Sequence, residues 1–218
     1  MSAGTPGPAR VAVVDYGAGN LVSIEQALTG VGAEVRIATR AADLADATLL
    51  VVPGVGAAGP AMDRLRAASL VAPIVDWIAA DRPFLGICLG LQLLFEGSDE
   101  DGAATLGVLR GRTVRLEDAP TLPHIGWNQV DRSREHPLFD GIADGADAYF
   151  VHSYAGRPAD PNDDAVLATT DHGRRFVSAV ARGNLIGVQF HPERSGRDGL
   201  RLLRNAVAIS VAASMVAA

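Results

Sequence analysis

In the first half of the chain, short apolar runs alternate with segments whose apolar residues recur at helical spacing. The apolar runs predict buried strands at residues 11–14, 35–38, 49–52 and 84–87. Helical spacing predicts a helix that starts at Leu21 and stops at Gly30, and further helices over 70–80 and 89–95. Strands that alternate with helices predict a parallel sheet covered by helices on both faces.

The second half has a different pattern, in which turns rich in Gly, Pro and Asp separate strand candidates. These candidates are residues 113–116, 148–151, 166–169, 176–180 and 185–190, and a last helix begins near Asp198. Closely spaced strands indicate antiparallel hairpins added to the parallel core. We therefore predict a three-layer, flavodoxin-like α/β fold: one domain over 11–218, preceded by a disordered extension at 1–10.

Composition narrows the class of protein. The net charge is −6, and no basic stretch is interleaved with aromatic residues, which argues against a nucleic-acid partner. One cysteine excludes an internal disulfide and favours a reducing compartment. Residues 1–10 lack the apolar core of a signal peptide, and the apolar run 206–218 is too short to span a bilayer. We expect a soluble cytoplasmic protein without a membrane segment.

The sole cysteine, Cys88, lies in the run Gly86-Ile87-Cys88-Leu89-Gly90, between a predicted strand and a predicted helix. This pattern matches the nucleophile elbow of hydrolases, with Cys in place of Ser. The glycines allow a tight turn, the following helix N-terminus favours thiolate, and the Leu89 N–H is a natural oxyanion donor. A free cysteine is more often a buried core residue. The flanking glycines and the strand-to-helix switch favour the nucleophile.

A thiolate that attacks an amide needs an acid to protonate the departing amine, usually a histidine oriented by a carboxylate. Of five histidines, His191 fits best, because it follows an apolar strand and precedes Glu193 by two residues. On an extended turn, both side chains point the same way, so Glu193 holds the imidazole. His124 and His152 are weaker candidates for this role.

Other sequence features indicate that the site holds no metal and no dinucleotide. His136 and His172 lie in polar sequence and are predicted to be solvated. No two histidines have the spacing of metal ligands, and one Cys forms no thiolate cage. The segment 15–20 lacks the complete glycine pattern of a dinucleotide loop. Pro53-Gly54-Val55-Gly56 is either a plain turn or a flexible strip that gives a second oxyanion N–H.

Together these motifs resemble a known family. Gly86-Ile87-Cys88-Leu89-Gly90-Leu91-Gln92 and Gln189-Phe190-His191-Pro192-Glu193 resemble the class I, triad-type glutamine amidotransferases. Segments 15–20, 53–56, 123–128 and 149–154 narrow the resemblance to the glutaminase subunits of imidazole glycerol phosphate synthase. Arg194 stands where those proteins commonly have lysine. Because the chain has no lysine at all, composition accounts for that difference.

The resemblance implies a role for each matching residue. Cys88 would form a thioester with the glutamine side chain, and His191 would act as general acid and base, oriented by Glu193. Val55 and Leu89 would supply the oxyanion N–H groups. The substrate glutamine would be held by a further set, namely Gly54, Gly56, Gln92, His152, Ser153 and Tyr154.

The resemblance also implies a partner. Trp127 and Tyr149 would face a HisF-like (β/α)8-barrel cyclase in a heterodimer, and ammonia would pass to it for histidine biosynthesis. No cofactor is expected. Three alternatives remain at this point: the glutaminase of another class I amidotransferase, a stand-alone cysteine hydrolase on a similar fold, or a non-catalytic interaction module. The intact set of Cys88, His191 and Glu193 argues against the last.

Overall fold

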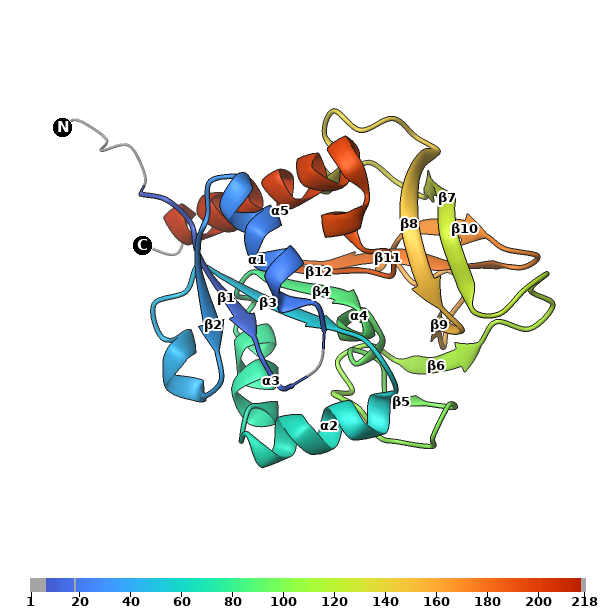
Figure 1. Ribbon diagram of the computed structural model, residues 1–218, viewed down its shortest axis with the longest axis horizontal. Helices are drawn as coiled ribbons and strands as arrows, with labels where there is room; N and C mark the ends of the chain where they lie inside the picture. Colours follow the sequence, from blue (N-terminus) through green and yellow to red (C-terminus); the bar gives the residue numbers. More distant parts are fainter. Residues whose placement is uncertain (1–6, 18, 217–218) are drawn as a thin grey trace.

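The computed structural model describes residues 7–17 and 19–216, and within them a nine-stranded sheet forms the centre (Figure 1). Its strands are β1 (Arg10–Val14), β2 (Glu34–Ala38), β3 (Leu49–Gly54), β4 (Phe84–Cys88), β7 (His124–Arg132), β8 (Ala146–His152), β10 (Val166–Asp171), β11 (Arg175–Arg182) and β12 (Leu185–Val188). The order is β2-β1-β3-β4-β12-β11-β10-β7-β8. The first five strands are parallel and the other four are antiparallel.

This sheet confirms the predicted fold class, a mixed sheet that is parallel at its core. The β2-β1-β3-β4 order is that of flavodoxin-like folds, whose sites lie at the carboxyl ends of the strands. A smaller sheet lies beside it, built from β5 (Gly97–Ser98), β6 (Gly111–Arg115) and β9 (Tyr154–Pro158).

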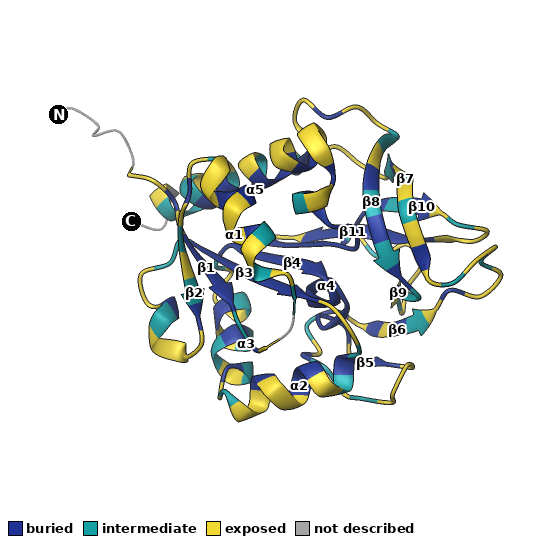
Figure 2. Ribbon diagram, in the orientation of Figure 1, coloured by how far each residue is buried: buried dark blue, intermediate teal, exposed yellow. Residues whose placement is uncertain are grey.

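Helices cover both faces of the parallel strands. They are α1 (Leu21–Gly30), α2 (Ala58–Ala67), α3 (Val71–Ala79), α4 (Leu89–Gln92) and α5 (Gly196–Val216). Helices α1 and α5 pack on one face with Val11 and Val13, whereas α2, α3 and α4 pack on the other with Ala12 and Val14. Figure 2 shows the result: β3 and β4 at the centre are buried along their whole length, whereas the helices are exposed on the sides turned away from the sheet. Successive β1 residues thus feed two separate apolar cores.

The helix after Cys88 is shorter than predicted. It covers Leu89–Gln92 instead of 89–95, because the next carbonyls are taken by a loop. Leu106 N–H donates to Leu93 O, and Val108 and Leu109 N–H donate to Leu94 O. Those carbonyls are therefore unavailable to a further helical turn.

The prediction that residues 1–10 form a disordered extension is wrong for the last two of them. Ala9 is buried, and Arg10 opens β1 opposite Glu34. The Arg10 side chain donates to the Asp46 carbonyl at 2.7 Å, which fixes this end of the strand. The rest of the predicted extension, 1–6, lies outside the described residues. That residues 11–218 form one domain stays a prediction, and no helix in the described ranges is long and apolar enough to cross a membrane.

Candidate active site

Cys88 occupies a strained turn between β4 and α4. Its φ is 53° and its ψ is −107°, a backbone conformation that residues other than glycine rarely adopt. The flanking glycines are required because there is no room for a side chain at either position. A Cβ on Gly86 would lie 2.7 Å from the Gly90 carbonyl carbon, and one on Gly90 would collide with the Val52 carbonyl. The sequence thus forces the thiol onto the tip of a tight turn at the carboxyl end of β4.

His191 and Glu193 form a buried pair beside this turn. Glu193 sits in a single 3₁₀ turn, Pro192–Arg194 (η3), and its Oε1 lies 2.8 Å from His191 Nδ1. Burial lowers the pKa of His191, but the nearby Cys88 and Glu193 side chains outweigh it and raise that pKa to about 10. His191 Nε2 has no hydrogen-bond partner among the described residues. That nitrogen is free to exchange a proton at the sulfur.

Backbone contacts to β8 hold His191 in place. His191 N–H donates to Tyr149 O at 2.9 Å, and the Ser195 hydroxyl donates to His191 O at 2.7 Å. Tyr149 N–H in turn donates to Ser195 Oγ at 2.9 Å. The Arg194 guanidinium lies 4.2 Å from the centre of the Tyr149 ring, a cation–π contact. Sequence reasoning gave Ser195 no role, although its hydroxyl joins Tyr149 on β8 to the backbone of His191.

A small cavity of about 280 Å³ opens at Cys88. It is lined by seven of the predicted site residues other than Cys88, namely Val55, Gly56, Leu89, Gln92, His152, Ser153 and Tyr154. Gly54 lies behind this lining, opposite Cys88 in the β3–β4 register. His191, Glu193, Trp127 and Tyr149 do not line it.

Glu100 also lines this cavity, and sequence reasoning missed it. Burial, and then the neighbouring Asp101, raise the pKa of the Glu100 carboxyl. Glu100 lies in a loop that the sequence marks only as polar surface, so its placement at Cys88 depends on the tertiary fold. A carboxylate at the wall of a small pocket suits a substrate that carries an ammonium group.

Two buried glutamines connect the cavity wall to the sulfur. Gln92 Nε2 donates to Tyr154 O at 2.7 Å and to Gln189 Oε1 at 3.1 Å. Gln189 Nε2 then donates to Cys88 Sγ at 3.5 Å. Both hydrogens of the Gln92 amide are therefore used inside the protein. Its Oε1 is the atom left to accept from a ligand.

The glycine strip after β3 is anchored by a tyrosine. The Tyr16 hydroxyl is buried and donates to Pro53 O at 2.9 Å. Burial, and then Cys88, raise the pKa of Tyr16. A Cβ on Gly54 would collide with this hydroxyl and would lie 3.0 Å from Leu89 Cβ. The strip therefore packs directly against the residue that follows Cys88, while Val55 is 46% exposed.

Trp127 and Tyr149 meet on the β7–β8 pair, where they are directly opposite in register. Their ring centroids are 6.0 Å apart in an edge arrangement. Trp127 is 57% exposed and Ile125 is 60% exposed, whereas Tyr149 is half-buried. Large exposed apolar side chains at one place on a surface are a feature of interfaces.

The two histidines predicted to be solvated, His136 and His172, are both half-buried. His172 stacks on His124 with ring centroids 3.9 Å apart. His152 lines the cavity, but its Nε2 contacts His124 Nδ1 at 3.2 Å. In the part of the chain that the structure covers, no group of three or more His, Cys, Asp or Glu side chains is arranged to hold a metal ion.

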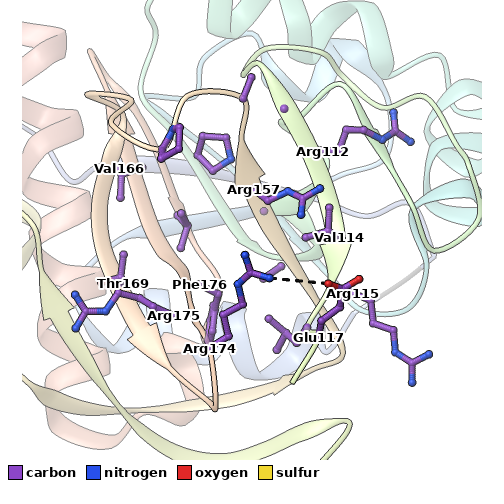
Figure 3. Close-up of a pocket in the computed structure, with 18 of the residues that line it drawn as sticks. Arg112, Val114, Arg115, Glu117, Arg157, Val166, Thr169, Arg174, Arg175 and Phe176 are labelled. Carbon is purple, nitrogen blue, oxygen red and sulfur yellow. Dashed lines mark ion pairs between the residues drawn. The ribbon is translucent and has the colours of Figure 1, made fainter. Parts of the chain in front are cut away.

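A larger cavity, about 800 Å³, lies elsewhere, between the small sheet and the β10–β11 hairpin (Figure 3). None of the predicted site residues lines it. The arginines that line it are exposed, and the side chains of Arg112, Arg115 and Arg175 point in different directions in Figure 3. Arg174 pairs with Glu117 at 3.9 Å. We therefore place the chemistry at the smaller cavity, where Cys88 and the buried polar groups converge.

Comparison with known proteins identifies the family. Residues 12–209 match the family described as glutamine amidotransferase class-I. The imidazole glycerol phosphate synthase subunit HisH of Symbiobacterium thermophilum is 50% identical over 198 residues, which cover 90% of this chain and 92% of that protein. The subunit of the same name from Thermococcus kodakarensis is 49% identical over 89% of this chain and 97% of its own length. The chain belongs to the HisH family of class I glutamine amidotransferases.

The predicted function is thereby confirmed: the chain is a HisH glutaminase subunit of imidazole glycerol phosphate synthase. This outcome decides against the stand-alone hydrolase and against the glutaminase of a different synthase. Solved structures support the fold alone. A GMP synthase subunit from Thermoplasma acidophilum has a TM-score of 0.73 at 19% identity, covering 97% of this chain and 98% of that one. PurLQS from Thermotoga maritima has a TM-score of 0.72 at 20% identity, covering 93% and 99%.

Proposed function

We propose that Cys88, His191 and Glu193 form the catalytic triad of this HisH glutaminase. One observation carries the proposal: the thiol at a strained elbow lies beside a histidine whose Nδ1 is 2.8 Å from a buried carboxylate. Glu193 fixes the ring so that Nε2 faces the sulfur, and it stabilises the imidazolium once it forms.

In the reaction, the Cys88 sulfur attacks the side-chain amide carbon of glutamine. His191 gives its proton to the departing nitrogen, which leaves as ammonia, and a γ-glutamyl thioester remains on the sulfur. Water then attacks the thioester carbonyl. His191 accepts the proton of that water, glutamate leaves, and the thiolate–imidazolium pair is restored.

The pocket residues have matching roles. Leu89 and Val55 donate their backbone N–H groups to the oxyanion, because one directly follows Cys88 and the other lies on the strip packed against Leu89. Gln92 Oε1 accepts from the substrate. Glu100 receives the α-ammonium group, since it supplies a carboxylate at the wall of the cavity. Gly54 and Gly56 give the strip its backbone freedom, and residues 152–154 form the facing wall.

The ammonia is used by a partner subunit. We infer a HisF-like (β/α)8-barrel cyclase that forms a heterodimer with this chain in the cytoplasm. Three exposed apolar side chains support a docking face here: Val55 at the cavity, with Ile125 and Trp127 on β7. A partner that covers this face would keep ammonia away from solvent as it leaves Cys88. Tyr149 would reach the partner through its contact with the Trp127 ring.

The proposal is tested with Cys88→Ala in the complex with its cyclase. Glutamine-dependent synthesis should be lost, whereas synthesis from added ammonium should remain at the wild-type rate. Loss of both activities would show that Cys88 is structural and would overturn the assignment. The isolated wild-type chain should show low glutaminase activity that rises when the liganded cyclase is added.

A further inference from the structure

Two histidines that the reaction does not use lie face to face beside the pocket. His124 on β7 and His152 at the end of β8 are directly opposite in register, and both are buried. His124 Nδ1 lies 3.2 Å from His152 Nε2, so one ring donates and the other accepts. The direction of that bond follows from the groups at the two outer ends of the pair.

At the β7 end, Asn128 fixes His124. Asn128 Oδ1 accepts from Gln129 N–H at 2.9 Å, and Nδ2 donates to Asp171 O at 2.7 Å, which sets the orientation of the amide. Nδ2 also lies 3.2 Å from His124 Nε2. Because Nδ2 only donates, His124 Nε2 must accept. Nδ1 of a neutral His124 then carries the hydrogen and points it at His152.

The pocket end requires the same direction. His152 Nδ1 lies 2.9 Å from Tyr154 O, and a carbonyl oxygen only accepts, so Nδ1 carries the hydrogen. His152 Nε2 is therefore the acceptor in a neutral ring. It receives the hydrogen from His124. The reverse tautomers would set two donors against each other at Asn128 and two acceptors against each other at Tyr154.

We infer that His124 and His152 are positioning residues, both neutral with the hydrogen on Nδ1, that fix the Tyr154 carbonyl and through it the Gln92 amide. Tyr154 O accepts from His152 Nδ1 and also from Gln92 Nε2 at 2.7 Å. A single directed chain thus runs from Asn128 through both rings to this carbonyl. It leaves Gln92 Oε1 turned to the substrate.

The packing around the rings suits this role. The His124 ring is stacked between Phe150 and His172, at centroid distances of 5.0 Å and 3.9 Å, with an interplanar angle of 20° on each side. The His172 Nε2–H donates to Thr121 O at 3.0 Å. Burial lowers the pKa of His124 to about 4 and that of His152 to about 3, which agrees with neutral rings.

The inference also explains why His152 is not the acid of the reaction, although it lines the cavity. Both of its ring nitrogens are engaged inside the protein, so neither can pass a proton to the leaving nitrogen. His191 keeps an unengaged Nε2 instead. The positioning role rests on the proposed binding of glutamine by Gln92, but the tautomers do not.

The first test is spectroscopic and uses the unmodified chain. Long-range ¹H–¹⁵N correlation of the histidine rings at neutral pH should show two residues in the neutral Nδ1–H form. Each is assigned by the signal lost in the His124→Asn or the His152→Asn variant. An Nε2–H tautomer, or a charged ring, at either position would overturn the inference whatever the catalytic assignment.

The second test is kinetic and uses the complex with its cyclase. His124→Phe keeps the stacked ring but removes the donor, and it should raise the KM for glutamine about tenfold, as expected for one lost hydrogen bond, with little change in kcat. His124→Asn places an amide donor near the original Nδ1 and should restore most of the lost affinity. His136→Asn is the control, because His136 lies outside the chain of bonds and Asn can replace its capping role.

An unchanged KM in His124→Phe would overturn the inference, and so would a His124→Asn variant no better than His124→Phe. Neither result would affect the nucleophile assignment, which depends on Cys88→Ala. If His124→Phe does not fold, the tautomer measurement on the unmodified chain still decides the question.

Discussion

Glu193 Oε1 lies 2.8 Å from His191 Nδ1, and the two side chains are only 5% and 7% exposed. A carboxylate and an imidazole at this distance with so little water form a strong charge-assisted hydrogen bond. The bond fixes which nitrogen of His191 carries a hydrogen and leaves Nε2 to the sulfur. Much of the proposed chemistry therefore depends on one short side-chain contact.

The first prediction removes the charge of Glu193 but keeps its shape. Glu193→Gln should lower the glutaminase kcat by roughly 10⁴-fold, the loss that follows when the carboxylate of a Ser-His-Asp triad is neutralised. The KM for glutamine should change little, because Glu193 does not line the cavity. Steady-state kinetics of the complex measure both values. Glu25→Gln, on the exposed side of α1, is the control, and an unchanged kcat in Glu193→Gln would contradict the assigned role.

The second prediction concerns stability at alkaline pH. The folded pKa of His191 is raised to about 10 from an ordinary value of 6.5. The protonated His191 therefore contributes its full stabilisation to the folded protein below pH 6.5. That contribution is lost as the pH rises toward 10, because His191 of the unfolded chain releases its proton at a lower pH than His191 of the folded protein. Urea unfolding of the wild type and of His191→Gln should show a stability difference that shrinks across this range. A difference that is constant with pH would contradict the raised pKa.

The third prediction tests the strain at Cys88. Glycine adopts a φ of 53° and a ψ of −107° without strain, whereas alanine, like cysteine, is strained in that conformation. Cys88→Gly should therefore be more stable than Cys88→Ala by about 1 kcal/mol, although both lack the thiol. At Ala212, an exposed position in α5, the order should reverse, with Ala212→Gly destabilising by about 1 kcal/mol. Chemical denaturation of the wild type and the three variants measures these free energies of unfolding. If Cys88→Ala were as stable as Cys88→Gly, or more stable, the strain at Cys88 would be contradicted.

The fourth prediction concerns the glycine that follows the elbow. A Cβ on Gly90 would collide with the Val52 carbonyl, which belongs to the central sheet and does not move easily. Gly90→Ala should destabilise the protein by about 2–3 kcal/mol, the upper range for overpacking. Gly30→Ala, at the end of α1 with no atom within 4 Å of the new Cβ, should be neutral or stabilising by up to about 1 kcal/mol. Equal thermal midpoints for the two variants would contradict the close packing of the elbow.

Local sequence was enough to place Cys88 and the His191–Glu193 pair, because each depends on residues that are neighbours in the chain. The Tyr16–Pro53 contact joins residues 37 apart, and the Gln92–Gln189 contact joins residues 97 apart. No local pattern indicates such pairs. Glu100 was missed for the same reason.

Two differences in secondary structure have similar causes. Helix α2 begins at Ala58 without a side-chain cap and contains Gly59 and Pro60, so it lacks the usual signal of a helix start. The turn after Gln92 stops because a distant loop binds the Leu93 and Leu94 carbonyls. Strands β3 and β4 of the parallel core were predictable because each is a continuous apolar run buried on both faces.

The central claim, that Cys88 carries the glutamyl group, is tested most directly by trapping the intermediate. The complex is mixed with glutamine and quenched in acid during turnover, and the peptide that contains Cys88 is analysed by mass spectrometry. We predict a γ-glutamyl adduct on Cys88 of the wild type that is absent from Cys88→Ala and forms more slowly when His191 is replaced by Asn, because the leaving nitrogen then lacks its acid. Turnover of glutamine by the wild-type complex with no adduct on Cys88, or with an adduct on another residue, would contradict the claim.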